Sequence, residues 1–370
     1  MPEAMKHGLG RPAVERIAAS LAAVSPGFPE QAFCSRALDG LPDLELKDRV
    51  RHIIRVLREF LPRGFSEAAA CLEKLGQCWM EGDPDDPLRG FAAWPVIDYV
   101  GEYGLEEPER ALETLRRLTP LFSAEFAIRA FIVRYPQLTY ARLEEWTADP
   151  DEHVRRLVSE GSRPRLPWGR RLQEAVKDPS RGLALLERLK DDPSEYVRRS
   201  VANHLNDVSK DHPGRVVTVC RAWLKDAGPN RRRLVRHATR TLVKQGHPEV
   251  FGLLGFTQRP RVELLSLDVS PATIRMGDAV AIVFELRSRG KSEQKLVVDY
   301  AVHHVRADGK TKPKVFKYRS VNLAPGEAIR LRKVHAVRPV TTRRYYPGEH
   351  AVEVLVNGRA LGRKPFVLGE

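Results

Sequence analysis

The sequence predicts two domains of different fold class, an all-α helical-repeat solenoid over residues 1–258 and an all-β immunoglobulin-like sandwich over residues 259–370. Three observations support this division. A ten-residue phrase recurs in the first part, and apolar residues there follow a helical period. Short segments rich in Val, Leu and Ile, separated by turn residues, fill the last part. A chain of 370 residues is long enough for about two domains.

The repeated phrase is the strongest of these signals. Asp149–Val158 returns, 43 residues later, as Asp192–Val201. A period near 40 residues is typical of HEAT and armadillo repeats, whose helix pairs stack and leave a concave surface. Each copy opens with Asp as an N-cap and Pro at the first helical position, which predicts helices at roughly 150–160 and 193–206. The Arg pair one turn into each copy is then available to the concave surface.

Further helices are predicted in the first domain by the same apolar period and by their end signals. They are Leu46–Leu61, Pro108–Leu118, Ala124–Arg134 after Ser123, and Arg231–Gln245, which is capped by Asn230 and ended by Gly246.

The strands of the second domain are short and bounded by turn dipeptides such as Asn357-Gly358, which is typical of tight hairpins. The candidates are Glu263–Val269, Ala279–Arg287, Lys295–Arg306, Lys314–Asn322, Ala328–Val337, His350–Val356 and Arg359–Val367. About seven antiparallel strands in this length favour an immunoglobulin-type sandwich, without the antibody disulfide because no Cys lies there.

Charge is unevenly distributed. Residues 1–150 carry 18 Lys and Arg against 24 Asp and Glu, residues 151–258 carry 22 against 13, and residues 259–370 carry 22 against 11. Two basic segments after an acidic one predict a polyanion-binding face, the alternative being a merely basic surface. No apolar run of membrane-spanning length and no hydrophobic signal core is present, so we expect a cytoplasmic protein with no membrane partner. The four cysteines show no metal-ligand spacing and are expected to be buried thiols.

Two basic clusters lie in the predicted sandwich. Two cations, two aromatics and two hydroxyl groups are adjacent in a predicted inter-strand loop, a composition that suits phosphate or minor-groove contacts. They are Thr341, Thr342, Arg343, Arg344, Tyr345 and Tyr346. The second cluster, Lys310, Lys312, Lys314 and Lys317, is equally explained by strand edges that charge protects from aggregation.

Familiar catalytic motifs are absent: the sequence has no Walker A loop, no dinucleotide-binding glycine motif, no H-E-x-x-H and no G-x-S-x-G. The His303-His304 pair lies in an alternating strand pattern and is interpreted as structural. Nothing therefore predicts a cofactor or a metal.

Acidic residues among cations and aromatics are the remaining candidates for chemistry. Arg156, Glu160 and Arg163 share one helical face, as do Arg199, Asn203 and Asp207. An Asp in a basic groove repels phosphate, so its presence needs a reason. The structural alternatives are an intrahelical ion pair of Glu160 with Arg156 and an ordinary helix-end carboxylate at Asp207. Glu125 is expected in a first helical turn, where a carboxylate interacts favourably with the helix dipole whatever else it does. Trp168 lies between proline and glycine.

Three segments carry a family resemblance: Trp94–Val100, Ser159–Trp168, with its Glu-Gly-Ser-Arg-Pro-Arg-Leu-Pro-Trp string, and Val201–Asp207. Together they resemble the AlkC branch of the alkylpurine DNA glycosylases built from HEAT-like repeats, across essentially the whole helical domain. The predicted sandwich resembles the immunoglobulin-like domain of some members. The superfamily also includes non-catalytic relatives.

The resemblance implies a monofunctional enzyme that removes cationic N3-alkylated bases, chiefly 3-methyladenine and also 3-methylcytosine, from duplex DNA. Glu125, Glu160, Trp168 and Asp207 match the family's active-site positions. Arg156 and Arg163 match groove-facing cations. The resemblance also implies that a bent duplex is gripped at an exposed lesion, although most glycosylases extrude the base.

The residue chemistry suits this role. Carboxylates stabilise the positive charge that develops on the sugar, and Asp207 is the expected group facing C1′ and its water. Trp168 offers a π-face to a cationic base. Phosphate contacts are expected from Arg156, Arg163, Arg199, Arg231, Arg232, Arg233, Arg343 and Arg344.

Two other functions stay open from the sequence: a non-catalytic HEAT-repeat protein that binds bent or branched nucleic acid, and a protein-interaction scaffold. The joint presence of Glu125, Glu160, Trp168 and Asp207 argues against the first alternative. We expect a monomer, with duplex DNA containing alkylated bases as its partner.

Overall fold

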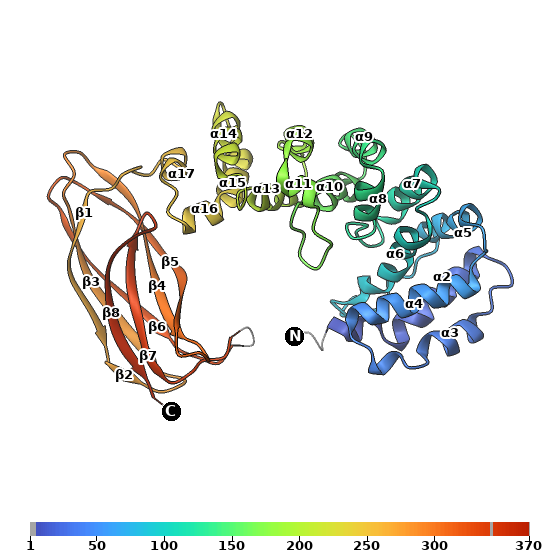
Figure 1. Ribbon diagram of the computed structural model, residues 1–370, viewed down its shortest axis with the longest axis horizontal. Helices are drawn as coiled ribbons and strands as arrows, with labels where there is room; N and C mark the ends of the chain where they lie inside the picture. The colour runs from blue at the N-terminus through green and yellow to red at the C-terminus, as the bar shows by residue number, and fades with distance from the viewer. Residues whose placement is uncertain (1–4, 341–342, 370) are drawn as a thin grey trace. The chain divides into compact units, whose positions relative to one another are not determined.

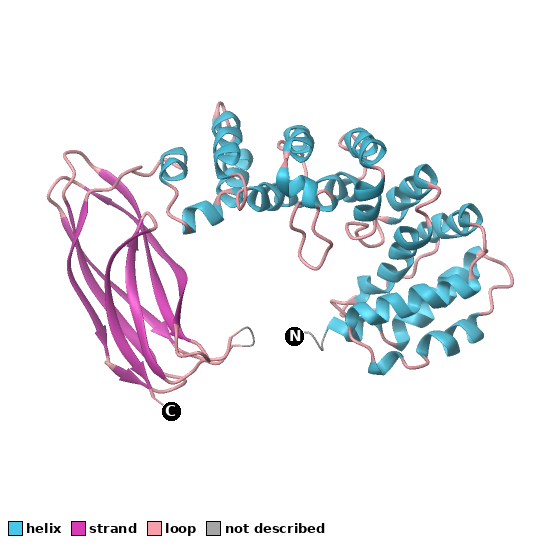
Figure 2. Ribbon diagram, in the orientation of Figure 1, coloured by secondary structure: helices cyan, strands magenta, loops and turns pink. Residues whose placement is uncertain are grey.

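The computed structural model describes residues 5–340 and 343–369 and divides into two compact units, Met1–Asp211 and His212–Glu370 (Figures 1 and 2). The first unit is helical, and the second joins further helices to two β-sheets. The predicted order of an all-α and an all-β region is confirmed. Packing groups the last helices with the strands, so the boundary at 258/259, inferred from composition, stays a prediction.

The first unit is a succession of short helices joined by turns and loops. They are η1 (His7–Leu9), α2 (Arg11–Val24), α3 (Glu30–Leu38), η2 (Leu41–Asp43), α4 (Leu46–Phe60), α5 (Phe65–Leu72), η3 (Glu73–Gln77), η4 (Arg89–Ala92), α6 (Ala93–Tyr103), α7 (Pro108–Leu118), α8 (Ile128–Arg134), α9 (Pro136–Trp146), α10 (Glu152–Gly161), α11 (Gln173–Lys177), α12 (Ser180–Leu189) and α13 (Glu195–Val208). Within this unit α7, α9 and α12 form an outer row, and α6, α8, α10 and α13 form the inner row (Figure 1).

The two repeat helices are α10 and α13, which pack against each other and against α12. They begin two residues later than predicted, because Asp149 and Asp192 are not N-caps. Each carboxylate instead accepts a backbone N–H two residues on, from Asp151 and Ser194, both at 2.9 Å. Such an Asx turn places the actual N-cap after the proline.

The Asp of each repeat also accepts a hydrogen bond from an Arg of the preceding repeat. Arg116 Nε donates to Asp149 Oδ2 and Arg155 Nε donates to Asp192 Oδ2, each at 2.7 Å. Arg155 further donates to the carbonyls of Asp149 and Pro150, at 2.8 and 2.9 Å. The first Arg of the repeated pair therefore joins repeats, and the second is the one left for the inner row.

The helix predicted from Ala124 begins at Ile128. Residues 124–127 form a turn whose bonds alternate between three- and four-residue spacing, as in Ile128 N–H to Ala124 O and Arg129 N–H to Phe126 O. Phe126 stacks on Trp94 of α6, with ring centroids 5.1 Å apart, and this packing accompanies the irregular turn. Glu125 therefore lies in a turn before α8 rather than in its first helical turn.

The second unit begins with helices and continues as strands. Its helices are α14 (Pro213–Leu224), α15 (Pro229–Ala238), α16 (Arg240–Lys244) and α17 (Pro248–Leu253). The single helix predicted for Arg231–Gln245 is thus two helices, and Gly228 rather than Asn230 is the N-cap. Thr239 separates them, with its hydroxyl donating to Val235 O at 2.8 Å. Gly246 ends the segment as predicted, with φ +74°.

The strands form two sheets, and each of the seven predicted strands is present. They are β1 (Val262–Ser270), β2 (Thr273–Ile274), β3 (Ala279–Ser288), β4 (Gln294–Val305), β5 (Thr311–Leu323), β6 (Ala328–Ala336), β7 (Gly348–Val356) and β8 (Arg359–Leu368). The sheet orders are β1-β3-β6 and β2-β8-β7-β4-β5. Pairing is antiparallel except between β2, a two-residue strand that the sequence did not indicate, and β8. Inward-facing residues of both sheets make one apolar core.

Sequence signals at the strand ends have mixed outcomes. Asn357 and Gly358 both have positive φ, 47° and 73°, as the tight turn between β7 and β8 requires. The Lys310–Lys317 cluster lies on and beside β5, an edge strand, which fits the protective role of edge lysines. Thr341 and Thr342 lie outside the described residues.

The cysteine prediction holds in part. Cys220 is buried, whereas Cys34, Cys71 and Cys78 are partly exposed, and all four are free thiols. Among the described residues, no helix combines the length and the apolar composition needed to cross a bilayer.

Candidate active site

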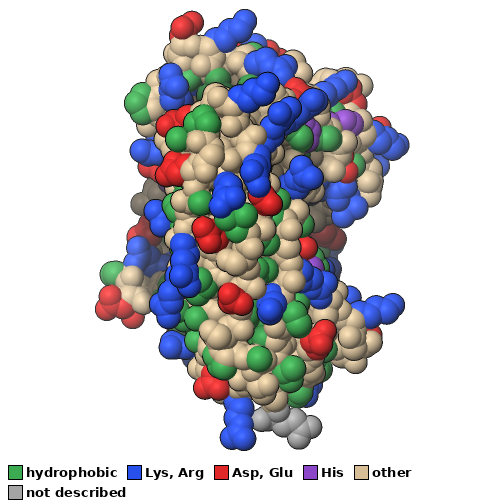
Figure 3. Space-filling view, turned by 90° about the vertical axis from the view of Figure 1, so that its left-hand side faces the viewer, with side chains coloured by type: hydrophobic (Ala, Val, Ile, Leu, Met, Phe, Trp, Pro, Cys, Tyr) green, Lys and Arg blue, Asp and Glu red, His purple; other side chains and the backbone are tan. Residues whose placement is uncertain are grey.

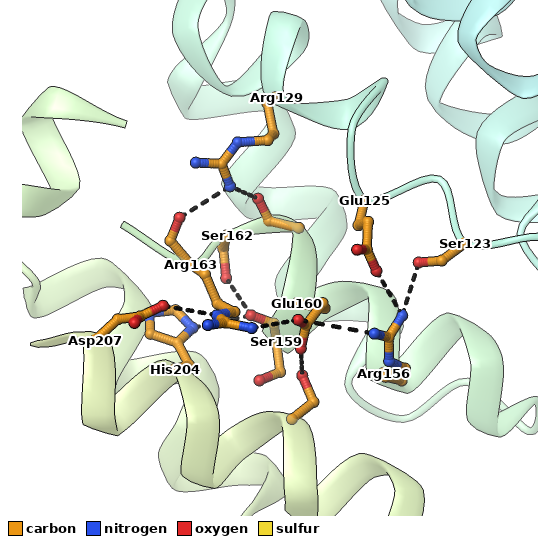
Figure 4. A network of polar contacts seen from close by, with 12 residues as sticks. Ser123, Glu125, Arg129, Arg156, Ser159, Glu160, Ser162, Arg163, His204 and Asp207 are labelled. Carbon is orange, nitrogen blue, oxygen red and sulfur yellow. Dashed lines mark hydrogen bonds and ion pairs between the residues drawn. The ribbon is translucent and has the colours of Figure 1, made fainter. Parts of the chain in front are cut away.

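A buried arginine connects two of the predicted acidic residues. Arg163, in the loop after α10, donates from Nε to Asp207 Oδ2 of α13 at 2.7 Å and from Nη1 to Glu160 Oε1 of α10 at 2.5 Å (Figure 4). Exposed fractions are 5% for Glu160, 7% for Arg163 and 2% for Asp207. Asp207 is thus no ordinary helix-end carboxylate, because it is buried and paired although it is the penultimate residue of its helix.

A second arginine extends the cluster to the turn before α8. Arg156 Nη1 donates to Glu125 Oε2 at 2.7 Å and to Ser123 Oγ at 2.9 Å. Its Nη2 lies 3.7 Å from Glu160 Oε1, so the intrahelical pair exists but is the looser contact of Glu160. The Arg156 guanidinium also lies over the Tyr196 ring, 4.9 Å from its centroid. The ion pairs therefore run from Glu125 through Arg156, Glu160 and Arg163 to Asp207.

Two members of the cluster escaped the sequence reasoning. Lys210 Nζ donates to Asp207 Oδ1 at 2.8 Å, and its side chain is 42% exposed. Ser200 Oγ donates to Glu160 Oε2 at 2.6 Å. The i,i+3 spacing of Asp207 and Lys210 is a signal that could have indicated the first contact, whereas the second joins residues 40 positions apart.

The cluster is balanced in charge, with three carboxylates and the three cations Arg156, Arg163 and Lys210. Burial alone would lower the pKa of Arg163, but the Glu160 and Asp207 carboxylates outweigh it and raise that pKa above its ordinary value. His204 adjoins the cluster, with Nδ1 2.9 Å from Ser159 O. Burial lowers the pKa of His204 to about 4, so it is neutral at pH 7. The site is therefore an array of three fixed carboxylates, each held by at least one arginine.

The loop that carries Arg163 is held from behind by Arg129 of α8. Its guanidinium, 1% exposed, donates to the carbonyls of Gly161, Arg163 and Arg170 at 2.7, 2.9 and 2.6 Å. Burial, with the nearby positive charge of Arg163, lowers the pKa of Arg129 to about 10. Three carbonyls fixed by one buried side chain leave this loop little freedom to move.

Trp168 lies in the same loop and has an unusual backbone conformation. Its φ is +63°, its side chain is 53% exposed, and its carbonyl accepts from Lys47 Nζ at 2.6 Å. The ring borders a cavity of about 260 Å³ whose other aromatic walls are Trp94 and Phe126. Trp168 is thus displayed at the surface and has no part in the ion-pair cluster.

Asp98 lines the same cavity and was noted in the sequence only as part of a familiar segment. Its Oδ2 accepts from Trp94 Nε1 at 2.7 Å, while its buried Oδ1 has no partner. Burial raises the pKa of Asp98 to about 7 in spite of that hydrogen bond, and the charges of Glu102 and Glu125 add to the effect.

The predicted phosphate-binding arginines lie in both units. Arg199 of α13 is exposed, whereas Arg163 is buried between carboxylates. Arg231, Arg232 and Arg233 lie on α15 of the second unit, where Arg232 Nε donates to Ala227 O at 2.8 Å. Arg343 and Arg344 precede β7, each with its guanidinium over a following tyrosine ring. DNA contact by any of these arginines stays a prediction.

The fold and the site together define a class: a HEAT-like helical array with a buried acidic cluster on its inner row, followed by a β-sandwich. Comparison with known proteins places the chain more closely. A family model described as the C-terminal Ig-like domain of uncharacterised protein YhaZ matches residues 263–370. The uncharacterized protein YhaZ of Bacillus subtilis (strain 168) is 35% identical over 334 residues, covering 90% of each protein.

One solved structure is similar over nearly the whole chain. It is Pseudomonas fluorescens alkylpurine DNA glycosylase AlkC bound to DNA containing an abasic site analog, with TM-score 0.90 and 38% identity, covering 99% of both chains. The chain therefore belongs to the AlkC family of HEAT-like alkylpurine DNA glycosylases, with a C-terminal immunoglobulin-like domain. The resemblance and the fold class predicted from the sequence are both confirmed.

Proposed function

We propose that this protein is a monofunctional DNA glycosylase that removes cationic N3-alkylated bases, 3-methyladenine and 3-methylcytosine, from duplex DNA. The observation that carries the proposal is the buried, charge-balanced cluster of Glu125, Glu160 and Asp207 with its arginines. Carboxylates repel DNA phosphates, so an acid-rich site lowers the affinity of a protein for DNA. The site is explained if its carboxylates stabilise a cationic substrate. Family membership supports the same activity.

The chemistry requires little acid catalysis. An N3-alkylated base already carries positive charge, so the electrons of the glycosidic bond pass to the base and the base leaves neutral. Positive charge then develops on the deoxyribose, where fixed carboxylate oxygens lower the barrier. Water adds to C1′, and its proton passes to a carboxylate and on to solvent. A lyase step would need an amine nucleophile, which this mechanism does not use.

Asp207 is the carboxylate we assign to the sugar, and Lys210 makes it available. Arg163 holds Oδ2 from a buried position, whereas Oδ1 is held by Lys210, whose side chain is 42% exposed. A DNA phosphate that attracts Lys210 would free Oδ1 to face C1′ and orient the water. In this arrangement Arg163 positions the acid, and Lys210 links release of its second oxygen to DNA binding.

The other residues have supporting roles. Glu125 and Glu160 hold the cationic base or share the water, and the exposed Trp168 ring provides a π-face, worth about 0.5–2 kcal/mol for a cation. Arg199, the arginines of α15 and those before β7 bind backbone phosphates, so that the β-sandwich serves as a second DNA contact. An open inner row of helices favours action on an exposed lesion in a bent duplex. A monomeric state and a cytoplasmic location are part of the proposal.

Base release from N-methylated duplex DNA tests the proposal. We expect the intact protein to release 3-methyladenine and Asp207→Ala to lose roughly 10²–10³-fold in rate, the usual cost of removing an electrostatic catalytic group. The matched control is Asp211→Ala, which removes a nearby carboxylate whose Oδ1 pairs with Arg165 Nη2 at 2.6 Å outside the cluster. Anisotropy with labelled duplex and thermal melting check that DNA binding and folding persist in both variants.

If the intact protein releases no base but binds DNA tightly and in a salt-sensitive way, the proposal is replaced by the alternative hypothesis. That hypothesis is a non-catalytic protein that binds bent or branched nucleic acid. Equal losses in Asp207→Ala and Asp211→Ala would remove Asp207 from the mechanism.

A further inference from the structure

A cavity of about 570 Å³ lies at one end of the β-sandwich, beside the turn between β4 and β5 and the segment leading to β7. We call it the cationic pocket. Five of its lining residues are cations: Arg306, Lys312, Lys314, Arg343 and Arg344. The acidic residue at the pocket is Asp308, whose carboxylate accepts from Lys310 N–H in the hairpin turn at 3.2 Å. The pocket therefore has a large excess of positive charge.

One of the residues that line the cationic pocket is a buried histidine whose ring nitrogens form no hydrogen bond. Val298, Tyr300 and Val302 of β4 face the apolar core, and His304 continues this inward series at the end of the strand, 5% exposed. Neither Nδ1 nor Nε2 of its ring has a hydrogen-bond partner. A buried polar group without a hydrogen-bond partner destabilises the fold, so a ligand that accepted a hydrogen bond from this ring would relieve that penalty.

The groups around His304 make a metal an unsuitable ligand and an anion a suitable one. Its ring neighbours are Tyr345, His350 and His335, with centroids 5.3, 5.6 and 6.4 Å away. Among the described residues no three His, Cys, Asp or Glu side chains are placed to hold a metal ion. Burial and the charges of Arg343, His350, His335 and Lys314 lower the pKa of His304 to about 3, so its ring is neutral and offers one N–H donor.

Three of the five cations of the pocket lie over aromatic rings rather than beside carboxylates. Arg343 lies over Tyr345 at 5.8 Å, Arg344 over Tyr346 at 5.4 Å, and Lys314 over Phe316 at 5.2 Å. Arg343 Nη1 is buried and has no hydrogen-bond partner. In the described part of the chain, none of the five cations forms an ion pair. Three of the five are thus held by rings and are not neutralised by carboxylates, which suits an anion site before its ligand arrives.

We propose that the cationic pocket binds a phosphate group, with His304 and Arg343 donating to its oxygens from within and the remaining cations enclosing it. Arginine suits a phosphate because its planar donors match two oxygens at once. The phosphate comes either from the DNA backbone or from free phosphate in solution. DNA as the source rests on the proposed function, but the pocket's affinity for phosphate does not.

The DNA source is tested with the full chain and an undamaged, fluorescein-labelled duplex, read by anisotropy over a range of salt concentrations. Arg343→Gln should weaken binding and lower the slope of log affinity against log salt by about 0.9, the loss of one phosphate contact. The matched control is Lys291→Gln, which removes an exposed cation from the turn before β4, at the opposite end of that strand from His304. The control should leave the slope unchanged.

The free source is tested by titrating inorganic phosphate into the histidine-¹⁵N-labelled chain and following the His304 ring by NMR. A saturable shift in the intact protein and in Lys291→Gln, abolished in Arg343→Gln, supports the site. If the salt slope does not change, that shift assigns the site to free phosphate. His304→Gln, which keeps one donor, is the second variant, and thermal melting confirms its folding.

Absence of both the slope change and the phosphate shift would overturn the proposal. Neither readout uses a damaged base, so failure of the glycosylase proposal would leave both measurements interpretable.

Discussion

The acidic cluster of the helical unit and the cationic pocket of the β-sandwich use arginine in opposite ways. In the cluster, Arg156 and Arg163 are held between carboxylates, so they orient acids and have little capacity left for phosphate. In the pocket, Arg343 and Arg344 lie on aromatic rings and have no carboxylate partner among the described residues. The group that an arginine contacts, more than its charge, thus distinguishes the proposed catalytic cluster from the proposed binding pocket. Figure 3, which views the side of the molecule where the strands lie, shows Lys and Arg spread widely over that face.

The largest expected effect is the loss of the arginine that holds the cluster together. Arg163→Met leaves Glu160 and Asp207 buried without their main partner, and breaking such a pair costs about 3–5 kcal/mol. Arg343→Gln removes no carboxylate contact and should change stability by no more than about 0.5 kcal/mol. The free energy of unfolding of both variants is measured by urea unfolding. Hydrogen exchange in α10, α13 and the strands then shows which part of the chain has lost stability. Equal losses would mean that the pocket arginine is as structural as the buried one.

The two arginines of the repeated phrase should separate in the same way, with a smaller effect. Arg155 joins repeats through Asp192 and two carbonyls, so Arg155→Gln should cost about 1.5–3 kcal/mol, as expected for hydrogen bonds to a charged group, and leave the salt slope of DNA binding intact. The exposed Arg199 should behave oppositely: Arg199→Gln keeps stability and lowers that slope by about 0.9. A stability loss in Arg199→Gln of the same size as in Arg155→Gln would contradict this division.

The pH dependence of the helical unit should carry the signature of Asp98. Its pKa is about 7 in the folded protein and near 4 when unfolded, so the folded state holds a proton that the unfolded chain has released between these values. Stability therefore falls as pH rises from about 4 to about 7 and stays lowered above that. Asp98→Asn, which cannot ionise, should gain stability relative to the intact protein at about pH 8 but not at about pH 4. Hydrogen exchange in α6 measures both conditions, and a gain of equal size at the two pH values would exclude ionisation as its cause.

The β-sandwich should show the opposite sign. His304 and His335 have pKa values of about 3 and 4, lowered chiefly by burial, so below the ordinary value of 6.5 the unfolded chain takes up protons that the folded state refuses. Their contribution is complete above about pH 6.5 and is lost progressively as pH falls toward the folded pKa values. Hydrogen exchange in β4 and β6 of the intact protein and of His335→Gln measures this loss. Identical pH profiles for the two proteins would contradict it.

The sequence predicted elements better than contacts, for a physical reason. Strand ranges and turns such as Asn357-Gly358 follow from local pattern, and every predicted strand end lies within three residues of the observed one. Asp149 and Asp192 form Asx turns instead of capping α10 and α13, so these helices begin two residues later than predicted. The arginines that bind the same carboxylates come from preceding repeats, and no local pattern contains such contacts. Likewise, the family resemblance implied that Arg163 is a groove-facing cation, whereas its burial between Glu160 and Asp207 depends on how α10 and α13 pack.

The smallest effect is expected at Trp168, and it tests the role of this aromatic ring directly. A non-glycine residue at φ +63° is held in a conformation that costs free energy, and its ring is 53% exposed, so packing gives little in return. Trp168→Gly should therefore fold with undiminished stability, because glycine adopts this conformation freely. Loss of the ring should slow release of 3-methyladenine by roughly 2- to 30-fold, the equivalent of about 0.5–2 kcal/mol of cation–π attraction, while Trp168→Phe retains most of the rate. The measurement is the rate of 3-methyladenine release by each variant, and the melting temperature of each variant shows whether it is folded. Slow release by a stable Trp168→Gly assigns the ring to the cationic base, and equal rates in both variants would leave the strained tryptophan without a catalytic reason.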